Sequence, residues 1–144
     1  MRNRLLLGIG TLLAIAGLTL GTPAAVARAD TTTQTGQAGA VTIKATWQGV
    51  EAGPVFTMVL DTHAVNLDSY DLTQLATLRT DQGIEAAPIG WEAPAGGHHR
   101  QGTLTFPLTQ PNGIPVLTGE TRQVELSIRE VGGVPETVLT WALP

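Results

Sequence analysis

The residues best able to carry chemistry are three histidines, two of which lie side by side in the stretch GGHHRQG, residues 96–102. The third, His63, lies in LDTHAV, two positions after Asp61. Side chains two positions apart in an extended chain point to the same side, so Asp61 and His63 can face one site. Adjacent residues point apart. One site therefore takes His98 or His99 readily, and takes both only if the loop curls.

A carboxylate combined with two imidazoles suits Zn²⁺ or Cu²⁺. The sequence thus allows a metal site made of Asp61, His63 and either His98 or His99. A soft-ligand Cu⁺ site is disfavoured because the chain has no cysteine. Two structural interpretations compete with the metal site. In one, His63 bonds a backbone carbonyl and Asp61 pairs with Arg100; in the other, these are unrelated surface residues.

Whether the histidines meet depends on the strands between them. Two strand passages are visible, LATLRT (75–80) and IEAAPIGWE (84–92). We expect an odd number of passages to bring His63 and the loop histidines to the same end of the fold. A third passage, through HAVNLDSYDL (63–72), would supply that odd number. On this basis, we expect all three histidines at one end.

The residues that serve covalent or acid–base catalysis are few. Ser69 and Ser127 are the only serines, and neither lies in a G-x-S-x-G nucleophile elbow. Asp68 and Asp71 could act as a carboxylate pair, but they lie in a polar turn where solvation is the default. We therefore expect a protein that is not an enzyme and needs no cofactor, unless the histidines bind Zn²⁺ or Cu²⁺.

Trp91 and Arg100 are the candidates for contact with a partner. Trp91 precedes a loop rich in proline and glycine, where an exposed aromatic ring can serve as a contact residue. The alternative for Trp91 is a lid over one end of the core. Trp47 and Trp141 fall on apolar faces, so we expect both in the core.

The first 29 residues have the three parts of a secretory signal peptide. Arg2 and Arg4 precede an apolar run over residues 5–20, and small residues follow as far as an A-x-A site at 27–29. The apolar run is shorter than the roughly 20 residues that a membrane-spanning helix needs. We expect cleavage after Ala29 and an exported protein, either secreted or held in the periplasm or cell envelope.

Removal of the leader makes the chain strongly acidic. Three of the eight Lys and Arg residues (Arg2, Arg4 and Arg28) lie in it, which leaves five basic against twelve acidic residues and a net charge near −7. Such a surface disfavours nucleic acid and anionic lipid as partners. We expect a protein or surface ligand, and no membrane contact after cleavage.

Period-two patterns indicate an all-β fold. Val41, Ile43, Ala45 and Trp47 share one side of a strand, and about seven such strands follow one another with turn signals between them. The fragment DSYDLTQLATL, residues 68–78, reads as one helical turn that enters a strand. Residues 30–40 contain no large apolar group and are predicted to be a flexible spacer. The pattern favours one antiparallel, immunoglobulin-like β-sandwich over residues 41–144, with a small β-barrel as the alternative.

Four stretches, LDTHAVNLDSYDL, LRTDQG, GGHHRQGTLTF and EVGGVPETVLTW, resemble secreted bacterial immunoglobulin-like domains of unknown function. The resemblance implies a non-catalytic extracytoplasmic module and carries over no functional residue. The expected function is therefore a secreted binding or interaction domain. The alternative is an extracytoplasmic protein that binds Zn²⁺ or Cu²⁺ through Asp61, His63 and His98 or His99.

Overall fold

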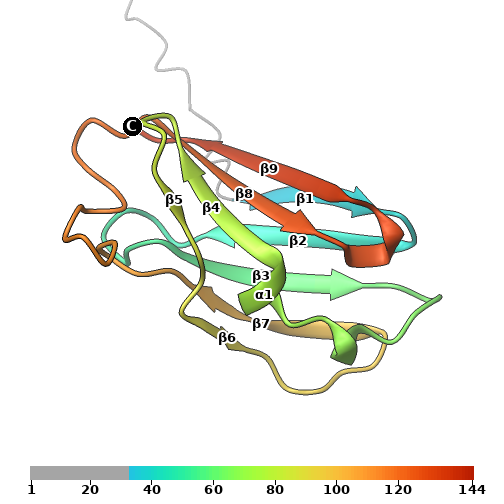
Figure 1. Ribbon diagram of the computed structural model, residues 1–144. Helices are drawn as coiled ribbons and strands as arrows, with labels where there is room; N and C mark the ends of the chain where they lie inside the picture. The colour runs from blue at the N-terminus through green and yellow to red at the C-terminus, as the bar shows by residue number, and fades with distance from the viewer. Residues whose placement is uncertain (1–32) are drawn as a thin grey trace, which may run out of the picture.

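The computed structural model describes residues 33–144, and the predicted signal peptide lies outside the described residues. The described chain is all-β, with nine strands in two antiparallel sheets (Figure 1). Three short helical turns, η1 (Leu67–Ser69), α1 (Leu72–Leu75) and η2 (Val131–Gly133), interrupt the connections. The strands are β1 (Thr33–Ala38), β2 (Val41–Trp47), β3 (Val55–Asp61), β4 (Ala76–Thr80), β5 (Glu85–Ala86), β6 (Gly90–Glu92), β7 (His99–Thr105), β8 (Gln123–Arg129) and β9 (Glu136–Ala142).

The two sheets enclose a single hydrophobic core. The first sheet has the strand order β1-β2-β3-β7-β6, and the second has the order β5-β4-β8-β9. Alternate residues of β2, β3 and β4 are buried between the sheets, as the period-two pattern predicts. The prediction of an antiparallel β-sandwich is therefore confirmed. Large buried side chains include Ile43, Phe56, Met58, Leu60, Leu78, Leu104, Phe106, Leu126 and Ile128.

An aromatic cluster lies within this core, close to the connection between β2 and β3. The ring of Phe56 contacts Trp47 and Trp141, with 5.0 Å between ring centroids in each case, and Phe106 at 5.9 Å. Both tryptophans are buried, as their positions on apolar faces predict. Because Trp47 belongs to the first sheet and Trp141 to the second, the cluster joins the two layers.

The prediction of a flexible spacer over residues 30–40 is wrong for residues 33–38. These residues form β1, which pairs with β2 along its whole length, from Thr33 opposite Thr46 to Ala38 opposite Val41. An edge strand needs few apolar side chains, because its backbone hydrogen bonds and one neighbouring strand hold it in place. Composition alone therefore failed to identify it.

The predicted third strand passage through residues 63–72 is also wrong. That segment contains η1 and ends at the first residue of α1, and the predicted helical turn before β4 is confirmed as α1. Each turn begins with a side-chain cap that competes with extended structure. Asn66 accepts a hydrogen bond from the Asp68 N–H, and Asp71 accepts one from the Thr73 N–H.

The chain makes two passages between β3 and β7. It runs out along β4 and returns along β5 and β6, which point the same way but belong to different sheets (Figure 1). Two passages, one out and one back, return the chain to its starting end, so the expectation of an odd number is wrong. The three histidines nonetheless lie at the same end of the fold, because Asp61 at the end of β3 lies directly opposite His99 at the start of β7.

The sandwich thus has two distinct ends. The histidine end carries the connections 39–40, 62–75, 93–98 and 130–135. The aliphatic end carries the connections 48–54, 81–84 and 106–122, at the left of Figure 1. Within residues 33–144, no helix has the length and apolar character needed to cross a membrane.

Two glycines fasten the β1–β2 turn to the β8–β9 turn at the histidine end. Gly39 and Gly132 have φ angles of 57° and 59°, in the left-handed region that favours glycine. A Cβ at Gly39 would lie 2.3 Å from the Gly132 carbonyl oxygen, and one at Gly132 would lie 2.0 Å from the Ala38 carbonyl oxygen. The two backbones can approach this closely only because neither residue has a side chain.

We expect Gly132→Ala to destabilise the fold much more than Gly133→Ala. Gly133 also has a positive φ, of 75°, but a Cβ there meets no heavy atom within 4 Å. The backbone strain of about 1–2 kcal/mol is common to both variants, whereas the clash adds about 1–3 kcal/mol at Gly132 alone. Urea unfolding measures the difference, and equal losses in the two variants would contradict the close contact.

Candidate functional site

The GGHHRQG stretch packs against the crossover connection of residues 62–75. It supplies the end of the β6–β7 connection and the first half of β7. The Leu67 N–H donates to the Gly97 carbonyl at 2.7 Å, and the Thr62 N–H donates to the His98 carbonyl at 2.9 Å. Gly96 faces the start of β7 across a tight turn, where a Cβ would lie 2.0 Å from the His99 carbonyl oxygen, and Gly97 has a positive φ of 64°. The two glycines therefore serve the turn that leads into β7.

Asp68 fastens the tip of this loop. Its carboxylate accepts hydrogen bonds from the Gly96 N–H at 2.8 Å and the Gly97 N–H at 3.2 Å. These hydrogen bonds, that from Gly96 first, lower the pKa of Asp68, and the Arg100 charge lowers it further. Asp68 therefore has a structural role, because its carboxylate holds the loop. The prediction of a solvated polar turn did not include this role.

Arg100 holds the other side of the crossover. Its guanidinium donates to the carbonyls of Leu67 at 3.1 Å, Tyr70 at 2.8 Å and Ala93 at 3.3 Å. The same group lies over the ring of Trp91, 5.4 Å from the centroid, which is a cation–π contact. The ion pair with Asp61 considered above is absent, since Arg100 is engaged with backbone carbonyls and Trp91.

Trp91 is half-buried and packs against the core. This position matches the lid interpretation rather than that of an exposed contact residue. The Trp91 Nε1 and Arg100 Nε atoms are the buried side-chain nitrogens of residues 33–144 that have no hydrogen-bond partner. Trp91 and Arg100, the two residues predicted to contact a partner, therefore both contribute to the packing of the histidine end.

Asp61 and His99 face each other across β3 and β7. They are directly opposite in register, and His99 Nδ1 lies 3.6 Å from Asp61 Oδ2. Their side chains are 52% and 64% exposed, so the pair lies on the surface. Thr62 between Asp61 and His63 is buried and donates its hydroxyl to the Ala40 carbonyl. Asp61 and His63 therefore flank a residue that points inward.

The structure gathers the four predicted metal ligands at one end but does not assemble them into a closed site. Only His99 lies against Asp61, while His63 and His98 are exposed. Within the described residues, no group of three or more His, Cys, Asp or Glu side chains is positioned to hold a metal ion. What the structure supplies is a pair of adjacent ligand atoms, Asp61 Oδ2 and His99 Nδ1.

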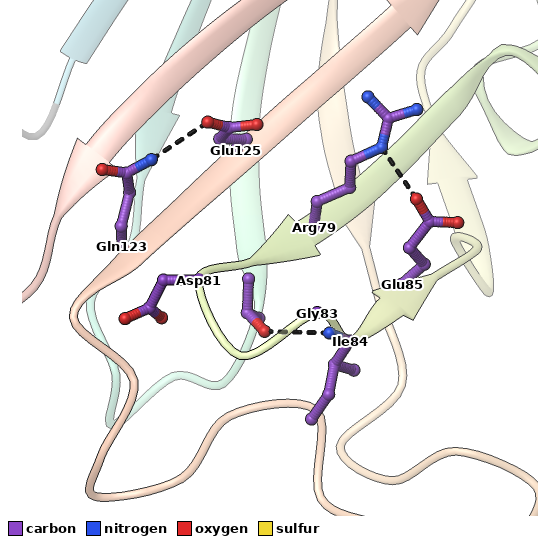
Figure 2. Close-up of a pocket in the computed structure, with 8 residues that line it drawn as sticks. Arg79, Asp81, Gly83, Ile84, Glu85, Gln123 and Glu125 are labelled. Carbon is purple, nitrogen blue, oxygen red and sulfur yellow. Dashed lines mark hydrogen bonds and ion pairs between the residues drawn. The ribbon is translucent and has the colours of Figure 1, made fainter.

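A shallow hollow of about 210 Å³ lies on the second sheet, beside the β4–β5 turn (Figure 2). Carboxylates and amides surround it, and the Gln123 amide donates to Glu125 at 3.0 Å. The lining residues are Arg79, Thr80, Asp81, Gly83, Ile84, Glu85, Gln123 and Glu125.

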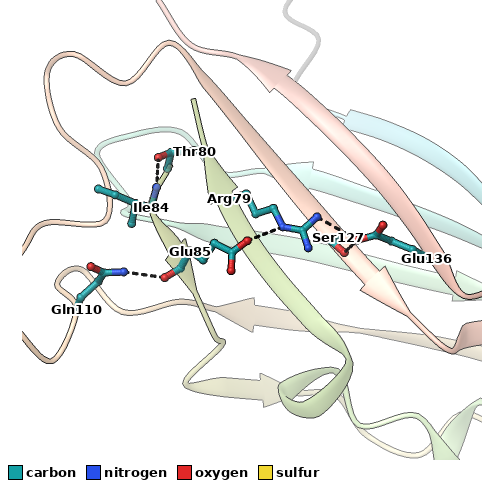
Figure 3. A network of polar contacts seen from close by, with 7 residues as sticks. All are labelled: Arg79, Thr80, Ile84, Glu85, Gln110, Ser127 and Glu136. Atoms are coloured by element: carbon teal, nitrogen blue, oxygen red, sulfur yellow. Dashed lines mark hydrogen bonds and ion pairs between the residues drawn. The ribbon is translucent and has the colours of Figure 1, made fainter. Parts of the chain in front are cut away.

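Arg79 connects this hollow to a polar network that the sequence analysis missed (Figure 3). Its Nε and Nη1 atoms each lie 3.0 Å from a carboxylate, that of Glu85 and that of Glu136 respectively. The buried Ser127 hydroxyl donates to the same Glu136 oxygen at 2.5 Å. The Ser127 hydrogen bond and then that from Arg79 lower the pKa of Glu136. The register of β4 with β5 could have identified the ion pair between Arg79 and Glu85, because these two residues lie opposite each other.

The aliphatic end has a different surface. Four large aliphatic side chains are exposed in or beside its connections: Val50 at 52%, Ile89 at 68%, Leu108 at 69% and Ile114 at 47%. Leu108 approaches the neighbouring connection, since a Cβ on Gly53 would lie 2.8 Å from it. Val138 on β9 is the remaining exposed large hydrophobic residue of the described chain. No sequence pattern had singled out these side chains.

Comparison of the chain with protein-family models, with curated proteins and with solved structures gives no match.

The lowered pKa of Asp68 predicts an acid-sensitive histidine end. Its contribution to stability is present above the ordinary carboxyl pKa of 3.8 and is lost as the pH falls through the lower folded-state value. We expect Asp68→Asn to lower the unfolding midpoint at neutral pH and to approach the wild type below about pH 3.

Thermal unfolding between about pH 7 and pH 2 measures this convergence. Glu92→Gln is the matched control, because Glu92 is exposed and makes no hydrogen bond through its side chain. An Asp68→Asn midpoint that stays equally far below the wild type at every pH would contradict the electrostatic role.

Proposed function

We propose that the protein is an exported, non-catalytic β-sandwich module that binds a protein or surface ligand through its aliphatic end. The observation that carries this proposal is the exposure of Val50, Ile89, Leu108 and Ile114 around one end of the sandwich. Exposed aliphatic side chains that gather in one region of a surface are typical of interaction sites. Loops held by a rigid sandwich are a common place for recognition.

The contrast between the two ends supports this assignment. At the histidine end, Asp68 and Arg100 bind backbone groups of neighbouring connections, so those polar side chains are already engaged. At the aliphatic end, Ile89 and Leu108 leave about two thirds of their surface in water. Removal of apolar surface from water is favourable by about 25 cal/mol per Å² before the entropic cost of association is subtracted.

The strand order supports a sandwich of immunoglobulin type. In that fold one sheet has the order A-B-E-D, and the other contains C, F and G with an optional C′. The strands β2-β3-β7-β6 match the first order, and β5-β4-β8-β9 match C′-C-F-G. On this correspondence, β1 is an additional strand beside A. Apolar side chains such as Met58 and Leu126 occupy the core, in a chain that has no cysteine for a disulfide.

Export and the class of partner rest on the sequence. The N-terminal pattern indicates secretion or residence in the periplasm or cell envelope. With five basic and twelve acidic residues after cleavage, the domain repels nucleic acid and anionic lipid. A protein or a neutral surface ligand with apolar groups is the partner that suits both the charge and the exposed aliphatic residues.

We expect Ile89→Asp combined with Leu108→Asp to abolish partner binding. The purified wild type and the double variant are immobilised at equal density and exposed to the extracytoplasmic fraction of the source cell. A charge in an apolar interface removes the contact and adds a desolvation penalty, so we expect recovery of the bound species to fall about tenfold or more.

Val138→Asp is the matched control, because Val138 is also an exposed aliphatic residue, at 43%, but lies on β9. Circular dichroism verifies that all the variants keep the β-sheet spectrum. Equal recovery on the double variant and the wild type would contradict binding through the aliphatic end. Turnover of a substrate by the purified protein would contradict the non-catalytic assignment.

A further inference from the structure

We propose that Asn112 is a site of spontaneous deamidation, where the side-chain amide is converted to a carboxylate through a cyclic intermediate with Gly113. The two residues lie at the tip of a hairpin in QPNGIP, residues 110–115, within the aliphatic end. The reaction consumes water and releases ammonia, and it requires no enzyme, metal or bound partner.

The tip of this hairpin is tight but fully exposed. The Gln110 N–H donates to the Ile114 carbonyl at 2.8 Å, and the Gly113 N–H donates to the Gln110 carbonyl at 2.9 Å. All residues from 111 to 115 are exposed, and a Cβ on Gly113 would meet no heavy atom within 4 Å. The turn is therefore held by hydrogen bonds within the hairpin, and it can open without any rearrangement of the core.

The Asn112 side chain is folded back over the backbone that follows it. Its Oδ1 accepts a hydrogen bond from the Ile114 N–H at 3.1 Å, which is an Asx turn. The ring closed by this hydrogen bond contains both Asn112 Cγ and the Gly113 nitrogen, so the two reacting atoms are held within one turn. The donated hydrogen bond also draws electrons from the amide carbonyl, which makes Cγ a better electrophile.

Gly113 supplies the nucleophile. Its backbone nitrogen loses a proton and attacks Asn112 Cγ, the new C–N bond closes a five-membered succinimide ring, and the side-chain nitrogen leaves as ammonia. Water then adds to one of the two ring carbonyls and breaks its bond to the ring nitrogen. Cleavage at Cγ gives aspartate, and cleavage at the main-chain carbonyl gives isoaspartate. Glycine favours the first step because it has no side chain to crowd the nitrogen, and its φ of 84° reflects its backbone freedom.

Asn66 offers an internal comparison within the described chain, because it has the same kind of side-chain hydrogen bond. Its Oδ1 accepts from the Asp68 N–H at 2.9 Å. The residue that follows is Leu67, which is buried and donates its N–H to the Gly97 carbonyl at 2.7 Å. Attack by the Leu67 nitrogen would break that contact and displace a buried side chain. Exposure and the following glycine, rather than the Asx turn alone, therefore select Asn112.

Both products add a negative charge to the aliphatic end, two residues before Ile114, which is 47% exposed. Isoaspartate also routes the main chain through the former Asn112 side chain and lengthens it by a methylene group within the turn. An added charge beside apolar contact residues opposes their burial. Deamidation therefore weakens binding to the proposed partner; this consequence rests on the proposed function, whereas the deamidation itself does not.

Incubation of the purified, folded protein at neutral and mildly alkaline pH, followed by proteolysis and mass spectrometry, tests the proposal without any partner. We expect the peptide that contains Asn112 to exchange an NH group for an oxygen atom progressively and to separate chromatographically into aspartate and isoaspartate forms. Conversion should accelerate as the pH rises, because the attacking nitrogen must lose its proton. The Asn66 peptide from the same digest should remain unchanged.

Gly113→Ala is the matched variant, since it keeps the Asn112 amide but places a methyl group beside the attacking nitrogen. We expect it to slow the conversion about tenfold or more. Circular dichroism verifies that both proteins stay folded during the incubation. Conversion of Asn66 and Asn112 at equal rates, an unchanged rate in Gly113→Ala, or an Asn112 that stays intact while a synthetic peptide of residues 108–116 reacts would each overturn the proposal.

Discussion

The crossover between the two sheets depends on one guanidinium group. Arg100 extends from β7 and donates to carbonyls of Leu67 and Tyr70 in the connection that leads from β3 to β4. A planar, permanently charged group with five donors can bind several carbonyls at once, which a lysine could not do in the same geometry. This contact fixes residues 67–70 of the crossover against β7, whereas the pairing of β3 with β7 places Asp61 opposite His99.

The sequence predicted the parts of the fold that depend on local alternation. Val41 to Trp47 alternates between buried and outward positions, and so does the strand that contains Phe56. It failed at β1, where a polar strand relies on pairing with β2 rather than on its own side chains. It also failed at residues 63–72, where the caps formed by Asn66 and Asp71 turn the chain into short helices.

The candidate sites were predictable only in part, because they also depend on contacts between strands rather than on local alternation. Two-residue spacing predicted that Asp61 and His63 face one site, whereas the structure pairs Asp61 with His99, and that pair depends on the register of β3 with β7. The stacking of Arg100 on Trp91 joins residues of neighbouring strands, and a period-two pattern contains no such information. The exposed aliphatic residues lie in irregular connections, where no periodicity separates an exposed leucine from a buried one.

The entry and exit of the described chain lie at the same end of the sandwich. Thr33 begins β1 opposite Thr46 near the end of β2, and the last carbonyl, that of Pro144, accepts a hydrogen bond from Arg122 just before β8. Both positions belong to the aliphatic end. A bulky group or a solid support attached closely to either end of the described chain would therefore crowd the aliphatic end. The histidines at the far end would stay accessible, so the choice of attachment point and linker length determines which end a bound or displayed domain can offer.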